Sequence, residues 1–384
     1  MSQKYPLVVC SKETIGGGGV FLNQISYLNK KYSVIYLLYK KNLITNLNRH
    51  AKYLNSYYPE YYRFSILKFL IFIKNFVLTC LFIRKNLLAI YFTTNFYTSI
   101  IILLAKRVFF KNIKAASLIN ININSLIKSK PNKIYQFILF RITKLLYKNN
   151  NFVFVSTGLA QYCSNLFELD KEKITIINSS IRLDLSIRKY LTQRNLFKRQ
   201  NDTKEIRIIS VGRLDWPKDF RTLLTSFYHV SNRFNNIKLY IVGEGRYRME
   251  LEKLANRLGI ASRTYFMGWK KNIYPYLAKS HIFVLSTLSD AFPRSLLEAM
   301  EIGLPVICTD VEFGPREILD NGKYGLLVRK QDINDLKESL TKLIQNKKLR
   351  VKYAQLALQR IKKYDFDYMI RNYEKFFTKI KNAN

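Results

Sequence analysis

Short apolar runs alternate with longer segments of helical spacing along most of the chain. In the first half the runs occupy residues 7–10, 32–39, 87–93 and 151–157. A second alternation begins at residues 206–214 and continues through 238–245, 282–287 and 305–310. Short runs that are apolar throughout are typical of strands buried on both faces of a parallel sheet. The pattern therefore predicts an α/β protein with two parallel sheets, each covered by helices.

A polar, basic segment separates the two alternations. It runs from Ser186 to Glu205 and contains no strand-like stretch, so it is the expected interdomain linker. This predicts one domain over residues 1–185 and a second over residues 206–360. The helical tail, residues 361–384, is expected to pack back on the first domain. A chain of 384 residues is long enough for two such domains.

One apolar segment is long enough to span a membrane. It starts at Phe64, reads FSILKFLIFIKNFVLTCLFI, and is about as long as a bilayer core is thick, roughly 20 residues. It contains Lys68 and Lys74, and a charge at mid-bilayer is costly. Lys68, Asn75 and Thr79 share one helical face. We predict an apolar amphipathic helix that packs on a sheet or lies on a membrane surface, with a transmembrane span as the alternative.

The charge is strongly basic and unevenly distributed. Residues 1–180 hold 25 Lys and Arg against 5 Asp and Glu, whereas the remainder holds 39 against 21. A basic field attracts nucleic acid, anionic lipid or phosphorylated substrates. Compositional drift toward Lys, Asn, Ile and Tyr is an equally plain explanation of the excess. Because no nucleic-acid recognition motif accompanies the charge, we expect no nucleic-acid partner.

The four cysteines give no metal or disulfide pattern. Cys10, Cys80, Cys163 and Cys308 are widely scattered. This usage fits a reducing cytoplasm. The N-terminal apolar run is too short for a signal peptide, so a cytoplasmic location is expected.

The candidate chemistry lies in the second half. The stretch SVGRLDWPKDFRTLL places Arg213 and Lys218 between a predicted strand and the start of a helix. Two cations beside a helix N-terminus suit a diphosphate, although surface salt bridges are the alternative. Gly243 and Glu244 follow the next strand, where Gly-x-Gly indicates either half of a dinucleotide fingerprint or a tight turn.

A third element joins a loop to a helix. In LSTLSDAFPRSLLEAMEIGLPVICTD, Asp290 lies in the loop after a strand, and Phe292 and Pro293 open a helix. The free N–H groups of the first turn can bind phosphate oxygens. Glu298 lies on this helix eight residues after Asp290, so both carboxylates are predicted to reach one pocket. Carboxylates accept hydrogen bonds from sugar hydroxyls.

In this order and spacing the three elements resemble retaining glycosyltransferase family 4. The resemblance is strong from Ile206 to Val328. It implies the GT-B architecture, in which two Rossmann-like domains face each other across a cleft. It also implies glycosyl transfer with retention of anomeric configuration, from a nucleotide-sugar bound mainly by the second domain to an acceptor bound mainly by the first.

The resemblance also implies residue roles. Arg213 and Lys218 would neutralise the leaving diphosphate, Glu298 would hold the donor ribose, and Asp290 would contact the donor sugar. Backbone amides near Arg294, Ser295 and Leu296 would touch the phosphates, with Gly243 and Glu244 also on the donor side. A first-domain loop would let the acceptor and donor approach the backbone; it consists of Gly16, Gly17, Gly18 and Gly19.

Three departures from the family pattern affect these roles. Asp290 stands where the family usually has Glu, and Ala291 replaces the usual Gly. The first half also lacks a clear counterpart of the family's active-site His. His50 lies in a polar stretch, and Asn120 or Asn122 occupies the approximate place. An amide can hydrogen-bond but cannot act as a general base.

Other polar residues receive no catalytic role. His229 and His281 have the pattern of ordinary helix and strand-edge residues. Asp365 and Asp367 resemble the metal-binding Asp-x-Asp of another glycosyltransferase fold, but they begin the final helix, where acids cap free N–H groups. No metal and no cofactor are therefore expected.

The predicted function is sugar transfer from a nucleotide-sugar, with UDP the expected nucleotide, to a glycan. The expected acceptor is carried on undecaprenyl diphosphate, in assembly of O-antigen, capsule or another surface polysaccharide. The first domain is expected to dock on the anionic inner face of the plasma membrane, through its basic excess and the helix carrying Lys68, Lys74, Arg84 and Lys85. The alternatives are a UDP-sugar 2-epimerase of the same fold and a non-catalytic or weakened nucleotide-sugar-binding protein.

Overall fold

The computed structural model describes residues 4–11, 24–38, 51–53, 66–130, 132–181 and 204–383. The chain forms two compact units. Unit 1 contains residues 1–178 and 367–384, and unit 2 contains residues 179–366. The expected linker lies outside the described residues except for its last two positions.

Unit 1 is built on a seven-stranded parallel sheet with the strand order β3-β2-β1-β4-β5-β6-β7. Pairs such as Leu7 with Ile90 and Ala116 with Asn151 fix its register. Its strands are β1 Tyr5–Ser11, β2 Tyr32–Leu38, β3 Ala51–Tyr53, β4 Ile90–Thr93, β5 Lys114–Ile119, β6 Asn151–Phe154 and β7 Ile174–Ile176. β4 is buried along its length, and β1 is buried from Leu7 onward, because helices cover both faces.

The described helices of unit 1 are α2 Ile66–Arg84, α3 Phe96–Val108, α4 Ile123–Lys128, α5 Lys133–Tyr147, α6 Thr157–Phe167 and the C-terminal α16 Phe366–Asn382. α3 contacts α2 on one side and α5 on the other. α3 is consequently buried over most of its middle, from Thr98 to Ala105, while α2 and α5 keep a solvent face.

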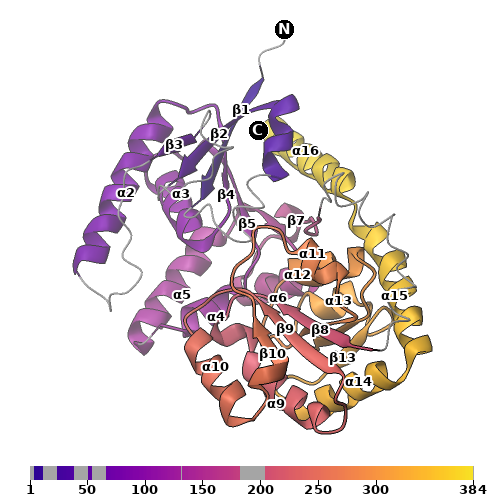
Figure 1. The fold of residues 1–384 in the computed structure, drawn as a ribbon. Coiled ribbons are helices and arrows are strands. Elements are labelled where there is room, and N and C mark those ends of the chain that lie inside the picture. The colour runs from indigo at the N-terminus through magenta and orange to yellow at the C-terminus, as the bar shows by residue number, and fades with distance from the viewer. Residues whose placement is uncertain are drawn as a thin grey trace. The chain divides into compact units, whose positions relative to one another are not determined.

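The last helix returns to the first sheet. α16, yellow in Figure 1, belongs to unit 1. Its Tyr373 and Phe377 pack against Phe92 of β4, with ring centroids 6.0 and 5.1 Å apart. Lys114, at the start of β5, donates to the carbonyl of Ala383 over 2.9 Å. The first unit is therefore completed by the last residues of the chain.

Helix α2 buries two polar residues and exposes several apolar ones. Its polar Asn75 and Thr79 are buried, and Asn75 Nδ2 donates to the hydroxyl of Tyr97 on α3 over 2.8 Å. Thr79 Oγ1 donates back to the carbonyl of Asn75 over 2.6 Å. Its exposed apolar residues are Phe69, Leu70, Ile73, Val77 and Leu81. Among the described helices, none combines the length and the apolar character needed to cross a bilayer.

Unit 2 is built on a six-stranded parallel sheet with the order β10-β9-β8-β11-β12-β13. Its strands are β8 Ile206–Val211, β9 Ile237–Val242, β10 Thr264–Phe266, β11 Ile282–Leu285, β12 Val306–Thr309 and β13 Leu326–Val328. Its helices are α9 Phe220–Ser231, α10 Arg248–Arg257, α11 Tyr274–Ala278, α12 Arg294–Glu301, α13 Pro315–Ile318, α14 Ile333–Gln345 and α15 Lys347–Ile361. The buried core joins β8, β9 and β11 to α9 and α14.

Candidate donor site

The candidate site lies at the carboxyl ends of β8 and β11. These strands are neighbours in the sheet, yet the chain leaves β8 for β9 on one side and reaches β11 on the other. The strand order therefore reverses between them. In open parallel sheets, ligands bind outside the carboxyl ends of the strands at such a point.

The structure brings Lys218 and Asp290 together. Lys218 ends a short 3-10 helix, Trp216–Lys218, after β8, and Asp290 lies in the loop after β11. Lys218 Nζ forms an ion pair with Asp290 Oδ2, and both side chains are about four-fifths buried. An ammonium group is thus held at the sheet edge, close to a carboxylate that partly balances it.

Polar side chains of the β11 loop fix this pair in place. Thr287 Oγ1 donates to the carbonyl of Pro217 over 2.7 Å, and Ser286 Oγ donates to the carbonyl of Lys218 over 3.1 Å. The Leu288 amide donates to Pro217 as well, over 2.8 Å. Sequence reasoning assigned no role to these residues, although a Ser-Thr pair directly after a buried strand was a usable signal.

Arg213 stands in solvent on the loop between β8 and Lys218. Its side chain is 78% exposed and lies 3.0 Å from Asp215, which also approaches Arg246 at 3.5 Å. Arg213 and Arg246 thus share one carboxylate. Because that leaves an excess of positive charge, this edge of the sheet favours an anion.

The glycines after β9 serve close backbone packing. A Cβ on Gly243 would lie 1.8 Å from the carbonyl oxygen of Gly212, and Gly243 has φ +150°. The Leu214 amide donates to the carbonyl of Glu244 over 2.9 Å. The Glu244 carboxylate itself pairs with Arg248 on α10. This turn therefore presses the β9 loop against the loop that carries Arg213.

Glu298 is a largely buried carboxylate on α12. Burial raises the pKa of Glu298 to about 6, and the positive charge of Arg294, 4.0 Å away, opposes that rise. Tyr274 is its other neighbour: burial raises the pKa of the Tyr274 hydroxyl, and the Glu298 charge adds to the rise. Sequence reasoning missed Tyr274, which precedes a proline eight residues before β11 and carries no motif.

The start of α12 is anchored from both sides. Arg294 Nη1 donates to the carbonyl of Ser180 over 2.8 Å, and Phe292 packs edge-on against Tyr364 with centroids 5.4 Å apart. Pro293 is the N-cap residue. The amides of Arg294 and Ser295 begin the first turn, where no helical carbonyl precedes them.

Leu296 and Gly314 complete this loop. The Leu296 side chain is fully buried, and its amide already donates to the carbonyl of Pro293 over 3.2 Å. Three amides were predicted to bind phosphate. The Leu296 amide is the one that already donates a hydrogen bond within the first turn of the helix. Gly314 has φ +64° and passes so close that a Cβ would lie 2.5 Å from the Ala291 carbonyl oxygen.

The remaining sequence candidates separate into described and undescribed positions. Gly16, Gly17, Gly18, Gly19 and His50 lie outside the described residues. Asn122 caps α4 by accepting from the Ser125 amide over 3.1 Å. His281 Nδ1 accepts from the Arg207 amide over 2.9 Å at the edge of β11, and His229 packs beside Tyr228 on α9. Asp365 precedes α16 and Asp367 lies in its first turn.

Comparison with known proteins matches these features to one family. The family of group 1 glycosyl transferases matches residues 192–360. An uncharacterized glycosyltransferase of Methanocaldococcus jannaschii is 30% identical over 286 residues, covering 65% of this chain and 69% of that protein. A Campylobacter jejuni enzyme is 29% identical over 244 residues, covering 64% of this chain and 61% of its own length; it is named a diphospho-undecaprenol 4-alpha-N-acetylgalactosaminyltransferase.

The fold comparison covers nearly the whole chain. An Anabaena protein, HepE, crystallised with UDP, superposes with a TM-score of 0.74 at 14% identity, covering 97% of this chain and 100% of that one. The predicted α/β class and GT-B architecture are therefore confirmed. On the family match, the relatives and the fold, the chain belongs to the group 1 glycosyltransferases.

Proposed function

We propose that this enzyme transfers a sugar from a UDP-sugar to a lipid-linked glycan, with retention of anomeric configuration. The observation that carries the proposal is the ion pair between Lys218 and Asp290, which lies where the strand order of unit 2 reverses. A cation held there, with Arg213 beside it, suits the diphosphate of a nucleotide-sugar. The UDP carried by the HepE structure accords with that choice of nucleotide.

The residues of unit 2 suit a reaction with a diphosphate leaving group. The bond between the anomeric carbon and the β-phosphate oxygen breaks, and a bond to the acceptor hydroxyl oxygen forms on the same face of the sugar. The acceptor proton passes to an oxygen of the departing diphosphate. Lys218, Arg213 and the first-turn amides of Arg294 and Ser295 stabilise the negative charge that develops, which is usually the largest catalytic contribution.

Glu298 and Asp290 would orient the donor. A carboxylate accepts two hydroxyl donors at once, so Glu298 suits the cis hydroxyls of a ribose. Its raised pKa means that the anion is poorly solvated before the ligand arrives. Asp290 is one methylene shorter than Glu, and we infer that Lys218 compensates by holding it toward the sugar.

We further propose an acceptor on undecaprenyl diphosphate and a role in surface polysaccharide assembly. The Campylobacter relative is named for a diphospho-undecaprenol substrate. Such an acceptor is anchored in the membrane, so the enzyme would work from the cytoplasmic face. The outward apolar residues of α2, among them Val77 and Leu81, support peripheral association.

The test is a transfer assay with a panel of UDP-, GDP- and ADP-sugars and a polyprenyl-diphosphate-linked glycan, with the product anomer read by NMR. The expected result is one UDP-sugar consumed only when acceptor is present, with an α-linked product from an α-linked donor. Epimer formation without acceptor would instead identify a 2-epimerase. Donor binding without turnover on any acceptor would identify a non-catalytic protein.

A further inference from the structure

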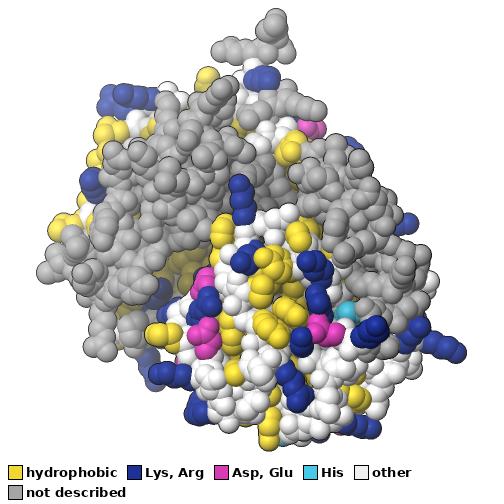
Figure 2. Space-filling model, in the orientation of Figure 1, with side chains coloured by type: hydrophobic (Ala, Val, Ile, Leu, Met, Phe, Trp, Pro, Cys, Tyr) yellow, Lys and Arg dark blue, Asp and Glu magenta, His cyan; other side chains and the backbone are white. Residues whose placement is uncertain are grey.

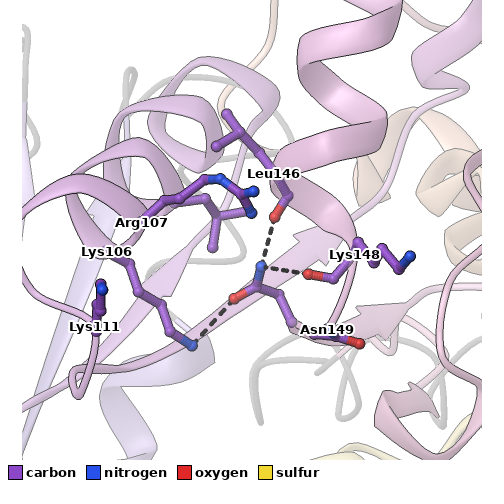
Figure 3. A pocket seen from close by; sticks show the side chains of 8 residues that line it. Lys106, Arg107, Lys111, Leu146, Lys148 and Asn149 are labelled. Atoms are coloured by element: carbon purple, nitrogen blue, oxygen red, sulfur yellow. Dashed lines mark hydrogen bonds between the residues drawn. The ribbon is translucent and has the colours of Figure 1, made fainter.

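A basic cavity lies in unit 1, where α3 and α5 end. Its volume is about 470 Å³, and it is lined by Leu103, Lys106, Arg107, Lys111, Leu146, Lys148, Asn149 and Asn150. Figure 3 shows Lys106 and Arg107 reaching from α3 toward the end of α5. Strands β5 and β6 begin just after these helices. The cavity is therefore at the amino edge of the sheet, the edge where parallel strands do not place their active-site loops.

The lining contains four cations and no carboxylate. In the described part of unit 1, two acidic side chains near this edge are paired with lysines. Glu168 pairs with Lys144 at 2.5 Å, and Asp170 lies 3.6 Å from Lys173. Lys173 also donates to the Asn149 carbonyl over 3.3 Å, which brings a further cation to the rim. The helix C-termini account for one or two cations by dipole compensation, but not for this number.

Lys106 is held inside the cavity by a neutral group. Its Nζ donates to Asn150 Oδ1 over 3.2 Å, and Asn150 in turn donates to the carbonyls of Leu146 and Lys148. Burial lowers the pKa of Lys106, and the charge of Lys173 lowers it further. An anion entering the cavity would relieve both effects.

Exposed apolar residues lie next to the lining residues along the chain. Val108 and Phe109 directly follow Arg107 and are 53% and 62% exposed. Phe109 packs against Phe76 of α2, with centroids 6.1 Å apart, and Phe76 directly precedes the exposed Val77. On α5, Leu145 is the exposed apolar residue next to the cavity, and Ile142, Ile138, Phe137 and Ile134 continue its solvent face toward the start of the helix. A free phosphate would need the cations but not this apolar surround.

We propose that the cavity binds the phosphate group of an anionic phospholipid, whose acyl chains lie against Val108, Phe109 and the outward faces of α2 and α5. The site builds on the proposed membrane association and names the contact that orients unit 1 on the leaflet. Cations within a Debye length of an anionic surface gain attraction, and the apolar rim adds burial in the interface. This ligand is separate from the donor and from the acceptor.

The test uses the full chain and sedimentation with vesicles of phosphatidylcholine, with or without phosphatidylglycerol. The variant Arg107→Glu/Lys111→Glu changes two exposed side chains of the cavity. Its matched control, Lys347→Glu/Lys348→Glu, makes the same charge change on exposed residues of unit 2. We expect the first variant to lose at least about tenfold in affinity for phosphatidylglycerol vesicles, and the control to lose much less.

Two further measurements distinguish lipid phosphate from inorganic phosphate, and the lipid site from the proposed sugar transfer. Lys106→Met keeps the apolar stem of the side chain and is expected to weaken vesicle binding. For the wild type, inorganic phosphate is expected to compete poorly with the vesicles at equal ionic strength. Equal losses in both charge-reversal variants would overturn the site, as would full competition by inorganic phosphate. Thermal stabilisation by UDP-sugar is read on the same samples: its retention in the cavity variants shows that unit 2 is intact, and its absence in the wild type would count against the proposed function alone.

Discussion

The two units have the same kind of sheet but opposite surfaces. In the described part of the chain, only three large exposed apolar side chains belong to unit 2: Trp216, Met249 and Trp269. In unit 1 such residues follow one another along α2 and α5. Most of the ion pairs among described residues lie in unit 2, and on its face seen in Figure 2 acidic side chains lie among the basic ones. Unit 2 therefore presents an ordinary water-facing surface around a polar site.

The basic residues therefore have different surroundings in the two units. In unit 2, cations such as Lys218 and Arg248 are paired with carboxylates, so charge is used for local geometry. In unit 1 few carboxylates are available, and cations such as Arg107 and Lys111 line a cavity beside exposed apolar residues instead. Paired charge builds a site for one small anion, whereas unpaired charge beside apolar residues suits an anionic interface.

The strongest effect should come from substitutions in the candidate site of unit 2, which should lower transfer activity without changing membrane binding. We predict that Lys218→Ala and Arg213→Ala each lower kcat by about 100-fold or more, because each removes a charge that stabilises the leaving diphosphate. The measurement is steady-state transfer at saturating acceptor. Vesicle binding should stay at the wild-type level in both variants. Near-normal rates in both would remove the diphosphate site from this edge of the sheet.

A smaller effect, on vesicle binding, should come from substitutions on the exposed surface of unit 1. Val77→Asp/Leu81→Asp places two charges on the outward face of α2, and we expect about thirtyfold weaker binding to anionic vesicles, from roughly 1 kcal/mol of lost burial per side chain. Met249→Asp on α10 is the control, because Met249 is 73% exposed in unit 2. If the control loses as much affinity as the α2 variant, the contrast between the two surfaces is wrong.

Glu298→Gln should separate binding from stability within unit 2. We expect about tenfold weaker UDP-sugar affinity by calorimetry, since an amide accepts fewer hydroxyl donors than a carboxylate. The free protein should become more stable, because a carboxyl whose pKa is raised from 4.5 to about 6 disfavours folding when ionised. That cost, about 2 kcal/mol, is absent below pH 4.5, grows as the pH rises toward 6 and is complete above it.

Two melting curves check the sign of this effect. Glu298→Gln should raise Tm relative to the wild type at pH 8 and leave it nearly unchanged at pH 4.5. A lower Tm at pH 8 would mean that Glu298 is stabilised by partners in the free protein. In that case its carboxylate would not be available for the donor.

The smallest expected effect is none. We propose that Lys218, Arg213 and the start of α12 supply the charge that a metal supplies in other transferases. Transfer rates should therefore be equal with EDTA and with added Mg²⁺ or Mn²⁺. A loss of activity in EDTA that Mn²⁺ restores would show that the cations of unit 2 are insufficient.

Much of the donor site was predictable because its residues follow the ends of strands. Arg213 and Asp290 each come just after an apolar run, and the carboxyl ends of parallel strands meet at one edge. Tyr274 and Gly314 were not predictable in this way, since neither follows a strand directly. Their places depend on how the loops pack: Gly314 passes against Ala291, and Tyr274 lies near Glu298.

The sequence alone determined the α/β class, the two alternating regions and the family, and it predicted the strand-end residues of the candidate donor site. These depend on local periodicity and on short spacings, which survive without knowledge of the packing. Only the tertiary structure decided which way α2 faces. Apolar residues lie all around this helix, so its pattern does not select a buried side, and in the fold Asn75 faces inward and bonds to Tyr97. The basic cavity likewise needed the fold, because Lys106 and Asn150 meet only when β5 and β6 lie side by side.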